Sequence, residues 1–204
     1  MKNAFLSIVL LLACYAVAGQ SKDSAAMARR DSLRMEKMLK SAIYPLIKTA
    51  KMGGVVPVAN PDEPIDPTIK YRLLMNFTQA ATTAAKAKEI NGALAEVARI
   101  INLHIAAGVP KENLELVVIA HGSGLFSLLD QKHYHKKFNI DNPNEALVKE
   151  LEDAGVKFLA CGQAMKFLDI EKTDLLNGIK QAYSAKTVIS TYSLKGFVLT
   201  DVNE

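Results

Sequence analysis

The fold is decided by the segment Gly155-Val156-Lys157-Phe158-Leu159-Ala160-Cys161-Gly162-Gln163. This segment predicts a short buried strand that runs into a turn and then into the first residues of a helix. In an open parallel sheet, ligands and reacting groups collect beyond the carboxyl ends of the strands. Cys161 lies at such a junction, where unpaired backbone N–H groups favour the thiolate over the thiol. We therefore expect a nucleophilic sulfur at the carboxyl edge of a parallel sheet.

Strand and helix patterns alternate on both sides of this segment, which predicts an α/β fold with a mainly parallel sheet covered on both faces. Helices are expected over 86–107, 142–154 and 186–195, with helical turns within 162–178. Five strands in a flavodoxin-like order connected by right-handed crossovers satisfy this pattern, with the first strand between the second and the third. The predicted strands are 71–78, 114–120, 156–160, 179–184 and 197–202.

The N-terminal residues 1–19 have the pattern of a secretory signal peptide: a positive start at Lys2, an apolar run, and a cleavage pattern before Gly19. The apolar run is too short to span a bilayer. We expect a periplasmic or secreted protein. The alternative is a lipoprotein anchored at Cys14, because the preceding residues approach a lipoprotein cleavage box.

Residues 20–69 are expected to form an N-terminal helix, with an apolar face from Leu33 to Ile43, and an irregular arm. Two glycines and four prolines between residues 53 and 67 argue against a helix or central strand there. Residues 70–204 then form the α/β domain. The length of 204 residues fits one such domain.

The charge balance excludes some partners. The formal net charge is +4 at pH 7, and one positive charge, Lys2, leaves with the signal peptide. So small a surplus indicates neither nucleic-acid binding nor attraction to an anionic membrane, and we expect no stable membrane insertion.

Cys161 is the only cysteine outside the predicted signal peptide, so the mature chain has no partner for an intramolecular disulfide. In an exported protein an unpaired cysteine indicates a reactive thiol or an intermolecular partner. A small buried core residue is the other interpretation, because free cysteines are often packed in cores. Spacing alone does not choose between the two.

His121 follows the strand 114–120 and lies at the same edge of the predicted sheet as Cys161. With one strand between them, their backbones would be roughly 10 Å apart. His121 would hold the thiolate or donate a proton during transfer; alternatively, it only hydrogen-bonds a loop backbone. We assign both residues to catalysis. The remaining candidate ligand-binding residues at this edge are Thr78, Gly122, Gly162 and Gln163, the last two through backbone N–H groups that stabilise an anion.

Other chemistries fit less well. Gly122-Ser123-Gly124 is not a G-x-G-x-x-G phosphate loop, and the chain has no G-x-S-x-G elbow. The pair His133 and His135 suits a metal, but the adjacent Lys132, Lys136 and Lys137 oppose a cation. We therefore expect neither a cofactor nor a metal.

Several short segments, in their joint order and spacing, resemble the DsrE/DsrF-like sulfur-relay family, most closely its exported single-chain branch. They cover most of the chain after residue 44. The resembling segments are Asn102-Leu103-His104, Gly108-Val109-Pro110, Val117-Val118-Ile119-Ala120-His121-Gly122, Asn142-Pro143-Asn144, 155–164, Ser184-Ala185-Lys186-Thr187 and Leu194-Lys195-Gly196-Phe197.

The resemblance implies a three-layer α/β/α flavodoxin-like fold and a homotrimer or homohexamer. It also implies that Cys161 accepts sulfane sulfur as a persulfide. The partners would be sulfur donor and acceptor proteins or small sulfane-sulfur compounds. Two departures affect this role. Relay proteins work in the cytoplasm as mixed complexes, whereas this chain carries an export signal. The mature chain also has no second cysteine to act as a resolving or partner thiol. The alternative is a non-catalytic oligomeric module that binds a small ligand and has a structural Cys161.

Overall fold

The structure is a computed structural model that describes residue 24, residues 26–81 and residues 83–203. The predicted signal peptide, with Cys14 and the cleavage region, lies outside these residues. In the part of the chain that is described, no helix has both the length and the apolar character needed to cross a membrane.

The chain divides into two units, and the first ends at Ser41. Its helix runs to residue 40 and exposes apolar side chains such as Met27 and Met35. Ser41 ends the helix, because its N–H and its hydroxyl both donate to Met38 O. Ile43, which was expected on the apolar face of this helix, instead pairs with Val55 in an antiparallel bridge in the second unit.

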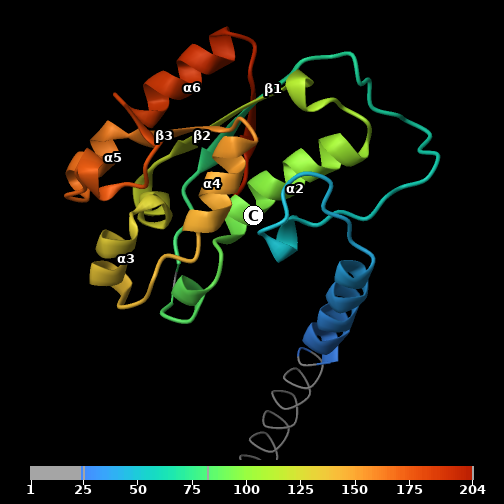
Figure 1. The fold of residues 1–204 in the computed structure, drawn as a ribbon, viewed down its shortest axis with the longest axis horizontal. Coiled ribbons are helices and arrows are strands. Elements are labelled where there is room, and N and C mark those ends of the chain that lie inside the picture. The colour runs from blue at the N-terminus through green and yellow to red at the C-terminus, as the bar shows by residue number, and fades with distance from the viewer. Residues whose placement is uncertain (1–23, 25, 82, 204) are drawn as a thin grey trace, which may run out of the picture. The chain divides into compact units, whose positions relative to one another are not determined.

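The second unit, Ala42–Glu204, is built on a sheet of five parallel strands. This confirms the predicted α/β class, and Figure 1 shows helices on both sides of the sheet. The strands match the predicted segments to within two residues at each end, with β4 three residues shorter than its predicted segment. They are β1 Tyr71–Phe77, β2 Leu114–Ala120, β3 Lys157–Cys161, β4 Lys180–Ala182 and β5 Val198–Asp201.

The strand order is β4-β3-β2-β1-β5, so the prediction that β1 separates β2 from β3 was wrong. Each connection from β1 to β4 steps one place in the same direction, and the chain then returns to the other side of β1. Both orders satisfy the right-handed crossover rule, so the strand pattern does not distinguish them. The consequence is that β2 and β3 are direct neighbours, only about 4.8 Å apart.

The two faces of the sheet are covered unequally. The larger core lies beneath α2 (Gly92–Ala106) and α4 (Glu145–Asp153), and the smaller lies beneath α6 (Ala185–Leu194), seen above the sheet in Figure 1. Side chains alternate between these cores along each central strand, as the period of two requires. The remaining helices are α3 Gln131–Phe138, α5 Gly162–Phe167 and the 3-10 turns Lys51–Gly53, Lys86–Lys88, Lys111–Asn113, Gly122–Leu128 and Lys172–Asp174.

Helix α2 begins at Gly92, six residues later than the pattern predicted, because Asn91 is the N-cap that precedes its first turn. Asn91 has extended backbone angles, and its side chain accepts a hydrogen bond from the N–H of Ala93. This is the geometry of an N-cap.

A buried asparagine on α2 holds the start of the arm. The Asn102 side chain is fully buried and accepts the N–H groups of Leu46 and Ile47 at 3.1 and 2.9 Å. Its amide donates to Ile47 O and Gly53 O. Asn102 thereby gives hydrogen-bond partners to backbone groups of the arm that would otherwise be buried without them.

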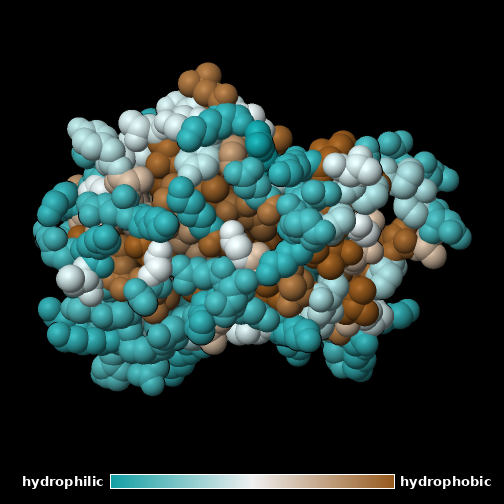
Figure 2. Space-filling view, turned by 45° about the horizontal axis from the view of Figure 1, so that its top comes forward, coloured by the Kyte–Doolittle hydropathy of each residue, from teal (hydrophilic) through white to brown (hydrophobic). Residues whose placement is uncertain are grey.

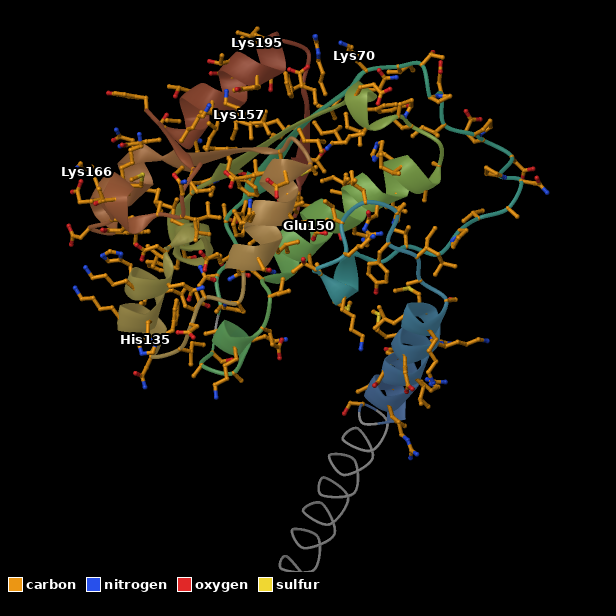
Figure 3. All side chains as sticks on the ribbon, viewed as in Figure 1. Lys70, His135, Glu150, Lys157, Lys166 and Lys195 are labelled. Carbon is orange, nitrogen blue, oxygen red and sulfur yellow. The ribbon has the colours of Figure 1, made fainter. Side chains whose placement is uncertain are left out.

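Glu150 on α4 makes a second clamp on the same segment (Figure 3). Its two carboxylate oxygens accept the N–H groups of Lys48 and Thr49 at 2.8 and 2.9 Å. Burial acts to raise the pKa of Glu150, but these hydrogen bonds together outweigh burial and lower the pKa below its ordinary value.

Replacing Asn102 by alanine should lower the free energy of unfolding by about 2–4 kcal/mol, because several buried backbone groups lose their partners. Urea unfolding followed by circular dichroism measures the change. Asn113→Ala is the matched control, since it removes one exposed hydrogen bond to Pro67 O and should cost less than about 1 kcal/mol. Equal losses in the two variants would contradict the clamp.

Glu150→Gln should be less stable than the wild type at neutral pH. Because the folded pKa of Glu150 is lowered, its stabilising effect is complete above pH 4.5 and is lost as the pH falls through the folded pKa. Unfolding at a series of pH values should therefore show the deficit shrinking in acid.

Glu152→Gln is the control on the same helix, with the opposite sign. Burial, and then the charge of Asp153, raise the pKa of Glu152, so its carboxylate opposes folding at neutral pH. This variant should match or exceed the stability of the wild type at pH 7, and a loss there would contradict our account of the two carboxylates.

Candidate functional site

A pocket of about 640 Å³ opens at the carboxyl edge of the sheet, on the face covered by α6. Groups from β1, β2 and β3 form its floor, and residues of α5 and α6 form its walls. Its lining consists of Asn76, His121, Cys161, Gln163, Ala164, Phe167, Ser184, Ala185, Lys186, Ile189 and Ser190.

Cys161 is the last residue of β3, and its side chain belongs to the smaller core beneath α6. The residue is 5% exposed, and its Sγ accepts a hydrogen bond from the N–H of Ala185 at 3.1 Å. Ala185 is the first residue of α6, so the sulfur lies at the positive end of that helix. Both the hydrogen bond and the helix end stabilise a negative charge on the sulfur.

Ser184 sets the start of α6. Its backbone is extended, and its hydroxyl accepts the N–H of Thr187, so the helix begins at Ala185. Of the first N–H groups of the helix, Thr187 is therefore capped by a side chain and Ala185 is left for the sulfur.

Gly162 lets β3 and the β4–α6 connection approach closely. A Cβ at this position would lie 2.7 Å from Ala182 O and 3.2 Å from Tyr183 O, both backbone atoms. Glycine is therefore required for the connection to bring Ala185 within hydrogen-bond distance of Cys161.

His121 lies beside Cys161 because Ala120 pairs with Ala160 in the parallel register. Its extended backbone continues β2, and its N–H donates to Phe77 O. The alternation along β2 therefore turns the imidazole toward the α6 side. Its Nε2 lies 2.8 Å from Oδ1 of Asn76 on β1.

Burial, and then the positive charge of Lys186, lower the pKa of His121 below 6.5, while Asp201 opposes that shift. The imidazole is therefore neutral at neutral pH. With Asn76 Oδ1 as the acceptor, Nε2 carries the ring proton and Nδ1 is free to accept one. A neutral His121 is therefore suited to act as a base, rather than as a cation that pairs with the Cys161 thiolate.

The carboxyl end of β1 is closed by Asn203. Its Oδ1 accepts the N–H groups of Thr78 and Gln79 at 2.7 and 2.8 Å, and its amide donates to Asn76 O at 2.9 Å. Thr78, a predicted ligand residue, thus has its N–H occupied and does not line the pocket.

Of the six predicted site residues, three line the pocket: Cys161, His121 and Gln163. Gly122 begins the turn after His121 with a φ of +54°, and Gly162 is covered by the β4–α6 connection. The N–H that reaches the sulfur belongs to Ala185 rather than to Gly162 or Gln163, the donors that were predicted. Three residues of the site were not predicted: Asn76, Ala185 and Lys186. Only Ala185 had a signal in the sequence, because the preceding Ser184 is a typical N-cap residue and marks the start of a helix.

The pair His133 and His135 lies on α3, away from the pocket lining. His133 contacts Asp130 and Asp174 through its two ring nitrogens, and His135 contacts Asp141. Among the residues that the structure describes, no group of three or more His, Cys, Asp or Glu is arranged to hold a metal ion.

Comparisons with known proteins support a family. A sequence profile of the DsrE/DsrF-like family matches residues 72–200. A solved structure of a protein of unknown function from Methanobacterium thermoautotrophicum is similar at 19% identity, with a TM-score of 0.48 over 64% of this chain and 98% of that one. No protein with curated annotation matches.

Gly162→Ala should displace the β4–α6 connection, because the new methyl group would lie only 2.7 Å from the backbone oxygen of Ala182 and 3.2 Å from that of Tyr183. We expect a loss of about 1–3 kcal/mol in stability. We also expect a changed rate of Cys161 alkylation by iodoacetamide, because Ala185 moves away from the sulfur.

Gly92→Ala is the control for this substitution. At Gly92 the only nearby atom is the flexible end of Gln79, and alanine favours a helix. This variant should keep the stability and the alkylation rate of the wild type. Identical behaviour of the two variants would contradict the role of Gly162.

Proposed function

The chain belongs to the DsrE/DsrF-like family, and we propose that it is an exported persulfide carrier that receives and passes on sulfane sulfur at Cys161. The observation that carries the proposal is the position of the sulfur. Cys161 Sγ accepts the N–H of Ala185 at the start of α6 and lies in one pocket with His121.

The chemistry is an exchange between sulfur atoms. The Cys161 thiolate attacks the terminal sulfur of a donor R–S–S⁻, the S–S bond breaks, and R–S⁻ leaves with the electron pair. An acceptor thiolate then attacks the outer sulfur of the cysteine persulfide and releases the Cys161 thiolate. No external oxidant or reductant is needed.

His121 supports the first step as a base. Its pKa lies below the ordinary histidine value, so the neutral ring accepts the thiol proton through Nδ1 while Asn76 holds Nε2. The N–H of Ala185 then stabilises the thiolate that remains.

The second candidate function is a ligand-binding module in which Cys161 is only a packed core residue. The observation that favours it is burial, because the cysteine is 5% exposed and belongs to the same small core as Leu159 and Val188. A packed thiol would leave the pocket free to bind a small molecule without reaction.

Assembly as a homotrimer or homohexamer remains part of the proposal. Large apolar side chains are exposed in the second unit, among them Leu194 at 90% and Val198 at 62%. Figure 2 shows apolar side chains reaching the surface between hydrophilic ones. Such surface is often covered by a neighbouring subunit.

The proposal that the protein is exported rests on the signal-peptide pattern of residues 1–19.

Purified protein treated with inorganic polysulfide should gain the mass of one sulfur atom on Cys161, reversibly under dithiothreitol, and Cys161→Ser should gain none. His121→Gln should slow the gain on the order of a hundredfold, because the base is lost. Intact-mass spectrometry over time measures both effects.

His135→Gln is the matched control, since this exposed histidine lies on α3 (Figure 3) and should react like the wild type. Equal sulfur uptake by the wild type and Cys161→Ser would rule out the persulfide proposal and leave the binding module.

A further inference from the structure

The pocket walls above Cys161 are apolar on two sides. Phe167 on α5 is 87% exposed, and Ile189 on α6 lines the same pocket with Ala164. An apolar ligand would cover these walls and remove them from water, which contributes about 25 cal/mol of binding free energy per Å² of apolar surface buried. A bare inorganic sulfur anion would make no use of them.

The polar part of the same pocket is positive. Lys186 lines it and forms no salt bridge within the described residues, and its charge reaches His121. None of the lining residues is acidic, although the charge of Asp201 on β5 also acts on His121. Together with the N-terminal end of α6, Lys186 suits an anionic group beside the sulfur.

The volume fits an organic molecule. Small-molecule sites range over about 300–1,000 Å³, and this pocket measures about 640 Å³. It is therefore large enough for a body of aromatic size and much larger than thiosulfate needs.

From these three features we infer that the sulfur donor is a small organic anion that carries its sulfane sulfur on an apolar body, as an aryl thiosulfonate does. The inference rests on the proposed function. The Cys161 thiolate attacks the sulfane sulfur of R–SO₂–S⁻, the bond between the two sulfur atoms breaks, and the sulfinate R–SO₂⁻ leaves with the electron pair. Charge and oxidation level balance without a further reactant.

The test compares benzenethiosulfonate with methanethiosulfonate, which carry the same reacting group on different bodies. Persulfide formation on Cys161 is followed by intact mass, and each rate is divided by the rate with free N-acetylcysteine to remove intrinsic reactivity. The normalised rate should be at least about tenfold higher for the aryl donor, from burial of the ring. Phe167→Ser should reduce this ratio several-fold, and Lys186→Gln should slow both donors.

Leu194→Ser is the matched control. Like Phe167, Leu194 is a highly exposed apolar residue, at 90%, but it lies at the end of α6 and does not line the pocket. It should keep the wild-type ratio. A normalised ratio near one in the wild type, or a ratio unchanged in Phe167→Ser, would overturn the inference even if polysulfide still sulfurates Cys161.

Calorimetry with the unreactive analogues benzenesulfonate and methanesulfonate separates this inference from the proposed function. If no donor sulfurates Cys161, the proposed function fails. In that case tighter binding of benzenesulfonate, weakened by Phe167→Ser, still supports the ligand class, and equal binding of the two sulfonates overturns it.

Discussion

The parallel register between β2 and β3 pairs Ala120 with Ala160, and this pairing fixes the first residue beyond each strand. His121 and Cys161 therefore start from adjacent backbones and, by the alternation of side chains, face the same side of the sheet. A slip of one residue on either strand would turn one of the two groups into the opposite core. Asn76 joins them from β1 by the same rule, and the cap at Ser184 then brings the α6 end onto the sulfur.

The unequal cover of the sheet explains why the pocket is on the α6 face. The opposite face is packed beneath two helices, α2 and α4, and the arm, whose backbone is held by Asn102 and Glu150. On the α6 face a single helix leaves the carboxyl edge partly open, and α5 is too short to close it. The open pocket thus lies beyond the carboxyl ends of the strands, where ligands bind in open α/β sheets.

The strands and the position of Cys161 were predictable, because buried parallel strands appear as apolar runs and Gly155 and Gly162 bound the third of them. The strand order was not, since helix and strand periods carry no information on which neighbour a strand chooses. The same limit applies to the site. His121 was found from its place after a strand, whereas the N–H of Ala185 comes from a helix start that is 24 residues away in the chain. Lys186 and Asn76 join the site only through the observed order of the strands.

The hydrogen bond from the N–H of Thr78 to the side chain of Asn203 joins positions 125 residues apart. Strand β5 pairs with β1 across a similar interval. Contacts between such distant segments form late in folding, because the intervening chain must first be ordered. The steps from β1 to β4 are local by comparison and can assemble earlier. Helix α6 lies in the chain between β4 and the closing strand β5. We therefore expect it to dock over Cys161 late in folding, when the other four strands are already paired. Until then the uncovered thiols of two folding chains would be able to form a disulfide with each other, so we expect rapid docking of α6 to raise the yield of folded protein.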